Sequence, residues 1–246
     1  MTVLVIDVGG TSVKILASGQ KEPRKFESGP SMTVAQMVDG AKKAAAGWKF
    51  DRVSIGYPGV VKKNQPVTEP YNLARGWVKF DYAAAFGCPV RIINDAAMQA
   101  LGSYNGGTML FLGLGTGLGT TLIVDGIVAP MELAHLPYRK ATYEDYVGVH
   151  AIERFGKKKW RKRVEDVVER LTAAFRPDDV VLGGGNSQRL EEVPPGCRLG
   201  DNDNAFLGGF RMWSGATSKV MPRVAARKLA RSVARKPARA TKKRSR

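Results

Sequence analysis

The chain has 246 residues, of which 43% are hydrophobic and 25% charged. This length predicts roughly one or two domains, and the composition excludes a wholly disordered protein. The two cysteines, Cys88 and Cys197, lie far apart outside any paired motif, which argues against a disulfide scaffold and a cysteine-based zinc site. The start of the chain lacks the pattern of a signal peptide, and the uncharged run 102–124 is too rich in Gly and Thr for a membrane helix. We therefore expect a cytoplasmic protein with no membrane partner.

The formal net charge of +17 is distributed unevenly. Residues 214–246 contain 12 of the 39 Lys and Arg and no acidic residue, so the first 213 residues keep 27 basic and 22 acidic ones. The last segment has too little apolar surface to offset the entropy of ordering, which predicts a separate, disordered basic tail. Such a tail either binds a polyanion without specificity or only increases solubility, and the sequence favours neither.

The first elements in chain order are three short strands, at residues 3–6, 13–17 and 24–27, separated by glycine turns. The same pattern of strand, Gly/Thr loop and strand returns at residues 108–112 and 120–124, followed by a hairpin at Asp125-Gly126. A repeated pattern of this kind predicts two related halves that face each other.

Helices and strands alternate between and after these two hairpins. We expect helices at residues 34–46, 82–86, 143–155 and 158–175 and from Asn94 onward, and strands at 52–56, 90–93 and 180–182. This order is typical of α/β architecture. We place an N-terminal domain at residues 1–95, a larger C-terminal domain at 96–213 and the tail at 214–246.

Two glycine loops carry the strongest chemical signal. Gly9-Gly10-Thr11 and Gly115-Thr116-Gly117 each lie between two strands, where residues without a Cβ let backbone N–H groups approach a phosphate. Neither is a Walker A loop or a dinucleotide fingerprint. Each loop alone is more often a tight turn, but the repeated pair favours phosphate binding. Asp7, just before the first loop, is placed to hold a hydrated Mg²⁺ beside the phosphates.

Asn94-Asp95 follows the strand at 90–93 and begins a helix. An Asp in this place is commonly only a helix cap, but phosphoryl transfer also needs one carboxylate that accepts the proton of an attacking hydroxyl. Sugar hydroxyls both donate and accept hydrogen bonds, and the side chains available for them are Asn72, Asn94, Glu132, His135 and Glu144. A third glycine cluster, 183–185, is by itself more typical of a plain turn than of a ligand site.

At these residues the chain resembles the ROK family of bacterial sugar kinases, within the actin–hexokinase superfamily. The resemblance covers about residues 2–212 and rests on an ordered set of motifs. These motifs are residues 7–11, the G-x-P-G loop 56–59, the N-D-A segment 94–96, the glycine loop 113–119, the sugar motif 132–135 and residues 181–185. Within the family, residues 143–148, 156–160 and 175–179 are most similar to the polyphosphate-dependent glucokinases.

The resemblance implies a duplicated actin/hexokinase-like (ribonuclease H-like) fold with a cleft between its domains. It implies transfer of a phosphoryl group from polyphosphate, ATP or both to the 6-hydroxyl of glucose or a related hexose, with Mg²⁺, in a homodimer. Asp95 would be the general base and, like Asn72, Asn94, Glu132, His135 and Glu144, would also bind the sugar. The phosphates would be bound by Gly9, Gly10, Thr11, Lys14, Gly115, Thr116 and Gly117. A nucleotide or the distal phosphates would lie at Gly183, Gly184 and Gly185.

Two positions depart from the family pattern. Many members carry a cysteine-rich zinc motif after the sugar motif, whereas residues 136–142 contain no cysteine, so we expect no zinc and a sugar-binding role for His135. Ala134 replaces the usual glycine and could crowd the sugar site.

The basic stretch 157–163 is either a solvated helical face or a positive rail for polyphosphate. Three interpretations of the whole chain therefore stay open. The first is a polyphosphate-using glucokinase, the second an ATP-dependent hexokinase of the same family, and the third a non-catalytic protein that binds sugar or polyanions. An intact Asp95 and two phosphate loops favour an enzyme.

Overall fold

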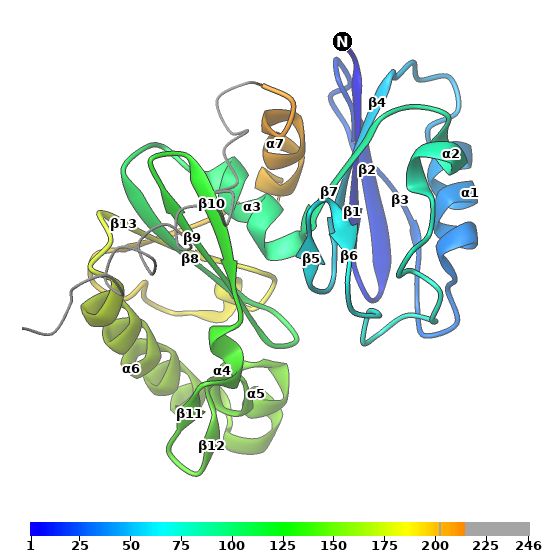
Figure 1. Ribbon diagram of the computed structural model, residues 1–246. Coiled ribbons are helices and arrows are strands. Elements are labelled where there is room, and N and C mark those ends of the chain that lie inside the picture. Colours follow the sequence, from blue (N-terminus) through cyan, green and yellow to red (C-terminus); the bar gives the residue numbers. More distant parts are fainter. Residues whose placement is uncertain (202, 215–246) are drawn as a thin grey trace, which may run out of the picture.

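The computed structural model describes residues 1–201 and 203–214, which form two five-stranded sheets with helices packed around them (Figure 1). The expected basic tail lies outside these described residues, apart from Ser214. Within the described residues, no helix is long and apolar enough to cross a bilayer.

The first sheet has the order β3-β2-β1-β4-β7. Its strands are β1 (Val3–Val8), β2 (Ser12–Ala17), β3 (Arg24–Glu27), β4 (Arg52–Tyr57) and β7 (Val90–Asn94). The first three strands form an antiparallel meander, while β4 pairs parallel with both β1 and β7. The central strand β1 is a continuous apolar run because both of its faces are covered, and Leu4, Val5 and Ile6 are fully buried.

Short elements complete this first half. Helix α1 (Val34–Ala44) begins at a capping box between Thr33 and Gln36 and buries one stripe of apolar side chains against the sheet. Helix α2 (Tyr82–Phe86) precedes β7, and the small hairpin of β5 (Val61–Lys62) and β6 (Gln65–Pro66) follows β4.

The second sheet repeats this topology, with the order β10-β9-β8-β13-β14. It contains β8 (Thr108–Leu114), β9 (Leu118–Val124), β10 (Ile127–Met131), β13 (Asp179–Gly183) and β14 (Cys197–Leu199). Again an antiparallel meander is extended by parallel strands. The expectation of two related halves in a mixed α/β protein is thereby confirmed.

One face of the second sheet is covered by α4 (Tyr143–Val147), α5 (Val149–Phe155) and α6 (Lys157–Phe175), which share a core with β8 and β13 (Figure 1). A hairpin of β11 (Pro137–Tyr138) and β12 (Ala141–Thr142) precedes these helices, and 3₁₀ turns lie at Leu133–His135 and Ser187–Arg189.

The helix expected at 143–155 is divided into α4 and α5 at Gly148. The backbone there is extended (φ −69°, ψ 173°), and a Cβ at this position would lie 2.6 Å from the carbonyl oxygen of Thr116. The helix is therefore interrupted where the chain must pass close to the second glycine loop, and the apolar periodicity that continues through this point does not reveal the break.

Helices α3 (Asp95–Ser103) and α7 (Asn204–Arg211) lie between the two sheets (Figure 1). Their backbones touch, because a Cβ on Gly102 would lie 1.8 Å from the carbonyl oxygen of Asn204. Helix α7, which the sequence analysis did not anticipate, also packs on the first sheet, where Ser54 donates a hydrogen bond to the carbonyl of Gly209 (2.6 Å). The last helix therefore contacts the half that begins the chain, and the domain boundary after residue 95 stays a prediction.

Candidate active site

A cleft of about 330 Å³ lies between the two halves and is lined by residues from both. The first half contributes the glycine turn after β1, the loop after β4 and Asn72, while the second contributes the loop after β8, the turn after β10, α4 and the loop after β13. The first turn of α3 also lines the cleft.

Asp95 is the first residue of α3 and follows directly on β7. Asn94 caps the helix by accepting a hydrogen bond from the N–H of Ala97 (3.1 Å), and its amide donates to Asp95 Oδ1 (3.0 Å). The N–H of Ala96 donates to the same oxygen (2.8 Å). Both of these hydrogen bonds reach Oδ1 and fix the carboxylate at the start of the helix, and the backbone N–H of Asp95 also donates to the carboxylate. The helix cap is Asn94, which leaves Asp95 available for chemistry.

Burial raises the pKa of Asp95 to about 7, and the nearby carboxylate of Asp7 adds to this effect. Burial also raises the pKa of Asp7 to about 6, against the opposing influence of Lys14, its cross-strand neighbour. Glycine at position 56 lets the two carboxylates approach, because a Cβ there would lie 2.3 Å from Met98 Cε of α3 and 3.5 Å from Asp7 Oδ1. Two acids with raised pKa values therefore lie close together, Asp95 in the lining of the cleft and Asp7 behind it.

The turn after β1 is shaped by its own hydrogen bonds. The N–H of Gly9 donates to the carbonyl of Ser12 (3.1 Å), and Ser28 Oγ donates to the carbonyl of Gly9 (2.6 Å). A Cβ on Gly10 would lie 3.1 Å from the Cβ of Asn72, so this glycine lets the two loops pack together. The first predicted phosphate loop and the first predicted sugar ligand are thus adjacent.

The loop after β8 packs tightly against α4. A Cβ on Gly117 would lie 1.8 Å from Glu144 Oε2, so no side chain fits at this position while the carboxylate stays where it is. At the start of β9, a Cβ on Gly119 would lie 2.7 Å from the Cβ of Ala96. The small residues at 96 and 119 therefore allow the second glycine loop to lie directly beside the turn that carries Asp95.

The loop after β13 is hydrogen-bonded to the loop after β8. Asn186 donates through its backbone N–H to the carbonyl of Leu114 (2.9 Å) and through its side-chain amide to that of Gly115 (2.8 Å). Gly184 adopts φ +79° and passes so close to Leu114 that a Cβ would meet its carbonyl oxygen at 2.5 Å. Of the third glycine cluster, Gly184 therefore lines the cleft, whereas Gly183 and Gly185 do not.

Glu132 and His135 lie on the 3₁₀ turn after β10, with His135 Nε2 4.0 Å from Glu132 Oε2. Both side chains are largely exposed, at 69% for His135 and 60% for Glu132, so they are accessible from solvent. Ala134 between them is buried and also lines the cleft. The methyl group that replaces a glycine here therefore does face the predicted sugar site.

The structure brings most of the predicted site residues together. Those that line the cleft are Gly9, Gly10, Asn72, Asn94, Asp95, Gly115, Thr116, Gly117, Glu132, His135, Glu144 and Gly184. Those that do not are Asp7, Thr11, Lys14, Gly183 and Gly185. Asp7 and Gly183 are buried or half-buried behind the cleft wall, whereas Thr11 and Gly185 are exposed.

Sequence reasoning missed two cleft residues, Gln99 and Phe111. Gln99 lies one helical turn after Asp95, on the same face of α3. Phe111 packs against Gly113 and Gly183, since a Cβ would lie 3.2 Å from its ring on Gly113 and 2.4 Å from it on Gly183. Helical spacing from Asp95 could have indicated Gln99, but nothing local distinguishes Phe111 from other apolar residues of its strand.

The described residues contain no group of three or more His, Cys, Asp or Glu side chains placed to hold a metal ion. A magnesium ion does not require such a cage, because it keeps most of its water and binds one or two carboxylates together with substrate phosphates. Asp7, a hard oxygen donor behind the first glycine turn and close to a second carboxylate, fits that requirement.

Solved structures share this architecture. An inorganic polyphosphate/ATP-glucomannokinase from Arthrobacter sp. strain KM superposes with a TM-score of 0.69 at 23% identity, covering 86% of this chain and 97% of its own. A ROK family glucokinase from Streptomyces griseus, in complex with glucose and AMPPNP, gives a TM-score of 0.73 at 15% identity, covering 86% and 99%. At these identities the likeness shows the fold alone, which is the expected actin/hexokinase-like fold.

Sequence comparison points in the same direction. The polyphosphate glucokinase of Mycobacterium tuberculosis is 27% identical over 201 residues, which span 76% of this chain and 72% of the relative. The model of the ROK family matches residues 2–130, more than half of the chain. The chain therefore belongs to the ROK family.

Proposed function

We propose that this protein transfers a phosphoryl group to the 6-hydroxyl of glucose or a related hexose, with inorganic polyphosphate, ATP or both as donor. The observation that carries the proposal is Asp95, a half-buried carboxylate with a raised pKa of about 7 that lies in the cleft between the two halves and beside two glycine loops. A general base works best when its pKa lies near the operating pH.

In the proposed step, the sugar oxygen attacks the terminal phosphorus of the donor. A new oxygen–phosphorus bond forms, the bond from that phosphorus to the bridging oxygen breaks, and the hydroxyl proton passes to Asp95. The hydrogen bonds from Asn94 and Ala96 hold Oδ1, so the other oxygen of the carboxylate is the one that would accept the proton.

The sugar would be held by the polar side chains around Asp95, namely Asn72, Asn94, Glu132, His135 and Glu144. Carboxylates, amides and an imidazole suit this task, because each hydroxyl of a hexose can donate one hydrogen bond and accept others. The position of Glu144 against Gly117 ties the sugar side of the cleft to the phosphate side.

The donor would lie along the two glycine turns, with Gly9 and Gly10 on one side and Gly115, Thr116 and Gly117 on the other. Thr11 and Lys14 do not line the cleft, so their contact with the donor stays a prediction. Asp7 would hold a magnesium ion through water, and that ion would supply positive charge at the phosphate oxygens.

Helix α6 supports polyphosphate as a donor. Trp160 is buried and donates to the carbonyl of Val147 (2.8 Å), and Arg161 donates to the carbonyl of Arg189 (2.9 Å) and pairs with Glu191. These contacts fix the start of α6 beside the loop after β13, whose first part lines the cleft. Lys157, Lys158 and Lys159 remain exposed there and could bind a chain of phosphates that extends out of the cleft.

The deciding experiment is a coupled assay of the purified protein in which ATP and polyphosphate are crossed with a panel of hexoses. We expect hexose 6-phosphate to form with at least one donor, and Asp95→Asn serves as the matched inactive control. Absence of product with every pair of donor and sugar, in a protein that is folded by circular dichroism, would contradict the proposal. Formation of a homodimer stays a prediction, which light scattering can check.

A further inference from the structure

A second and larger cavity, of about 600 Å³, lies apart from the cleft. Its walls come from β7 and the β5–β6 turn of the first half, from β10 of the second, and from α3 and the end of α7 between them. None of its lining residues belongs to the proposed active site. Its volume is within the range of pockets that bind small molecules.

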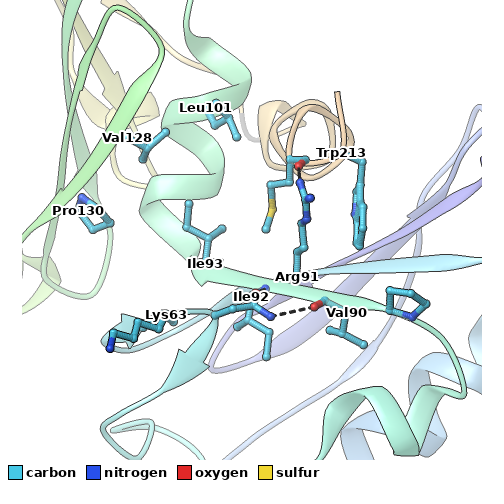
Figure 2. Close-up of a pocket in the computed structure, with 13 residues that line it drawn as sticks. Lys63, Val90, Arg91, Ile92, Ile93, Leu101, Val128, Pro130 and Trp213 are labelled. Atoms are coloured by element: carbon cyan, nitrogen blue, oxygen red, sulfur yellow. Dashed lines mark hydrogen bonds between the residues drawn. The ribbon is translucent and has the colours of Figure 1, made fainter. Parts of the chain in front are cut away.

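The lining is apolar with a cationic edge. Ten of the thirteen lining residues are apolar, two are the cations Lys63 and Arg91, and none is acidic. Figure 2 shows Arg91 and Trp213 side by side on one side of the cavity, with Leu101, Val128 and Pro130 across the space from them. Among the described residues, no carboxylate lies within ion-pair distance of either cation.

Arg91 is held in place without being neutralised. Its guanidinium donates to the carbonyl of Met212 and stacks over the ring of Trp213, with 4.3 Å from Cζ to the ring centroid. Trp213 is itself fixed, because its indole N–H donates to Ser54 Oγ (2.9 Å) and Arg52 stacks on the same ring (4.9 Å). The described residues therefore leave the remaining N–H groups of Arg91 available at the edge of an apolar cavity.

The wall formed by β7 is also preformed. β7 is an edge strand of the first sheet, and the side-chain amide of Asn64 pairs with its free edge by donating to the carbonyl of Val90 (2.9 Å) and accepting from the N–H of Ile92 (2.6 Å). This pairing keeps another strand from adding there. The space is therefore open to a compact ligand and closed to an extended peptide.

We propose that this cavity binds an amphipathic anion, that is, a compact apolar body with one negatively charged head group, and that the head group pairs with Arg91. An apolar body would bury its surface against Ile93, Leu101 and Val128, and the unpaired guanidinium would select for the charge. A polyphosphate chain, charged along its whole length, does not match these apolar walls.

The test is fluorescence titration of the full chain with 1-anilinonaphthalene-8-sulfonate and with N-phenyl-1-naphthylamine, which has the same apolar body without the sulfonate. We expect one saturable site for the sulfonate. Arg91→Gln should weaken sulfonate binding about 10-fold and leave the neutral probe within about twofold. Arg91→Lys should restore part of the loss.

Two matched pairs of variants keep the test valid if Arg91→Gln disturbs the fold. Lys63→Asn should weaken sulfonate binding about 2-fold to 3-fold, because the charge is lost while Asn still tolerates the φ of 51° at this position. The control Lys62→Asn should leave sulfonate binding unchanged. Val128→Trp should fill the cavity and abolish binding of both probes, whereas Val124→Trp, on an exposed position of β9, should leave both unchanged.

Three results would overturn the proposal: equal loss of the neutral probe and the sulfonate in an Arg91→Gln chain that is folded by circular dichroism, binding that Val128→Trp leaves intact, or binding that appears only in a chain ending at Ser214. The last result would identify residues 215–246 of the chain itself as the occupant. Competition with decanoate and with 1-naphthoate then distinguishes an acyl from an aromatic body, and displacement by neither anion would also count against the proposal.

Discussion

At the scale of single residues, the two buried carboxylates account for most of the expected chemistry. Burial raises the pKa of both carboxyls, the carboxylate of Asp7 raises that of Asp95 further, and the cross-strand influence of Lys14 opposes the effect of burial on Asp7. A carboxylate in water would be ionised at pH 7 but too weak a base to be useful, whereas Asp95 is both partly ionised and more basic.

Asp95→Asn tests the base directly. Asn keeps the size and the hydrogen bond from Ala96 but cannot accept the proton, so we expect kcat to fall by about 10² to 10⁴ with much less change in sugar affinity. Steady-state kinetics together with glucose binding by calorimetry measure both quantities. A variant with near wild-type kcat would reduce Asp95 to a structural residue and direct attention to Glu132 or Glu144.

The pH profile should report the same group. Because the base must be deprotonated, kcat/KM should rise with pH through a midpoint near the pKa of about 7 and level off above it. Asp7→Asn removes the like charge, so the midpoint should shift to lower pH. The measured quantity is the pH of the midpoint and not the rate itself, because Asp7→Asn would also lower the rate if Asp7 holds the magnesium ion. A midpoint unchanged by Asp7→Asn would show that the two carboxylates do not interact.

The contribution of Asp95 to the free energy of unfolding should fall as pH rises, whereas kcat/KM should rise. A carboxyl whose pKa is higher in the folded than in the unfolded protein contributes stability below its unfolded pKa of about 4 and loses this contribution as pH rises through the folded value. Asp95→Asn should therefore raise the free energy of unfolding at pH 8 by roughly 1 to 3 kcal/mol and by less at pH 5. Urea unfolding at the two pH values checks this, and an equal effect at both would contradict it.

At the scale of elements, α6 is the feature that separates the two donors. Its apolar stripe, including Trp160 and Val164, packs on the second sheet, and Arg161 is already bound to the 189–191 loop. The lysines of its first turn and Lys162 are exposed, whereas Arg163 lies over the ring of Tyr146 and Arg170 pairs with Asp166.

Replacing Lys157, Lys158 and Lys159 together by Gln should raise KM for polyphosphate about 10-fold or more while leaving KM for ATP within about twofold, because a longer anion contacts more cations. The difference between the effects on the two KM values should become smaller as the salt concentration increases. The matched control replaces Lys42, Lys43 and Lys49, three exposed lysines of the first half, and should affect neither donor. An equal rise in KM for both donors would contradict the proposed role of α6 in binding polyphosphate.

At the scale of the whole molecule, α7 joins the end of the described chain to the first sheet. Gly209 passes so close to β1 that a Cβ would lie 2.3 Å from a methyl group of Val5, and Trp213 donates to Ser54. With α3, which carries Asp95, this helix sets the position of one half relative to the other.

Because these contacts are made by Gly209 and Trp213, and every described residue of the cleft precedes them in the chain, a chain ending at Ser214 should fold and keep kcat within about twofold. Binding to heparin-agarose should weaken, since 12 basic residues are absent. Thermal unfolding and the coupled assay measure the outcome. An insoluble or inactive product would show that residues 215–246 pack on the core.

The sequence alone determined the parts of the site that depend on local geometry. A glycine turn between strands, or an Asp that opens a helix after a buried strand, is required by backbone conformation and close approach, and such requirements leave a signature within a few residues. Gly9, Gly10, Asp95 and Gly115 were found in this way, and all line one cleft. The repeated hairpin likewise indicated two related sheets.

Only the tertiary structure decided features that arise from distant contacts. Gly148 interrupts a helix because Thr116 passes beside it, and Asp95 gains its pKa of about 7 because folding buries it near Asp7. The apolar cavity beside Arg91 exists because β7, β10 and α7 converge there. Each effect depends on residues tens of positions apart in the chain, where no local pattern of polarity or backbone preference can record which segments will meet.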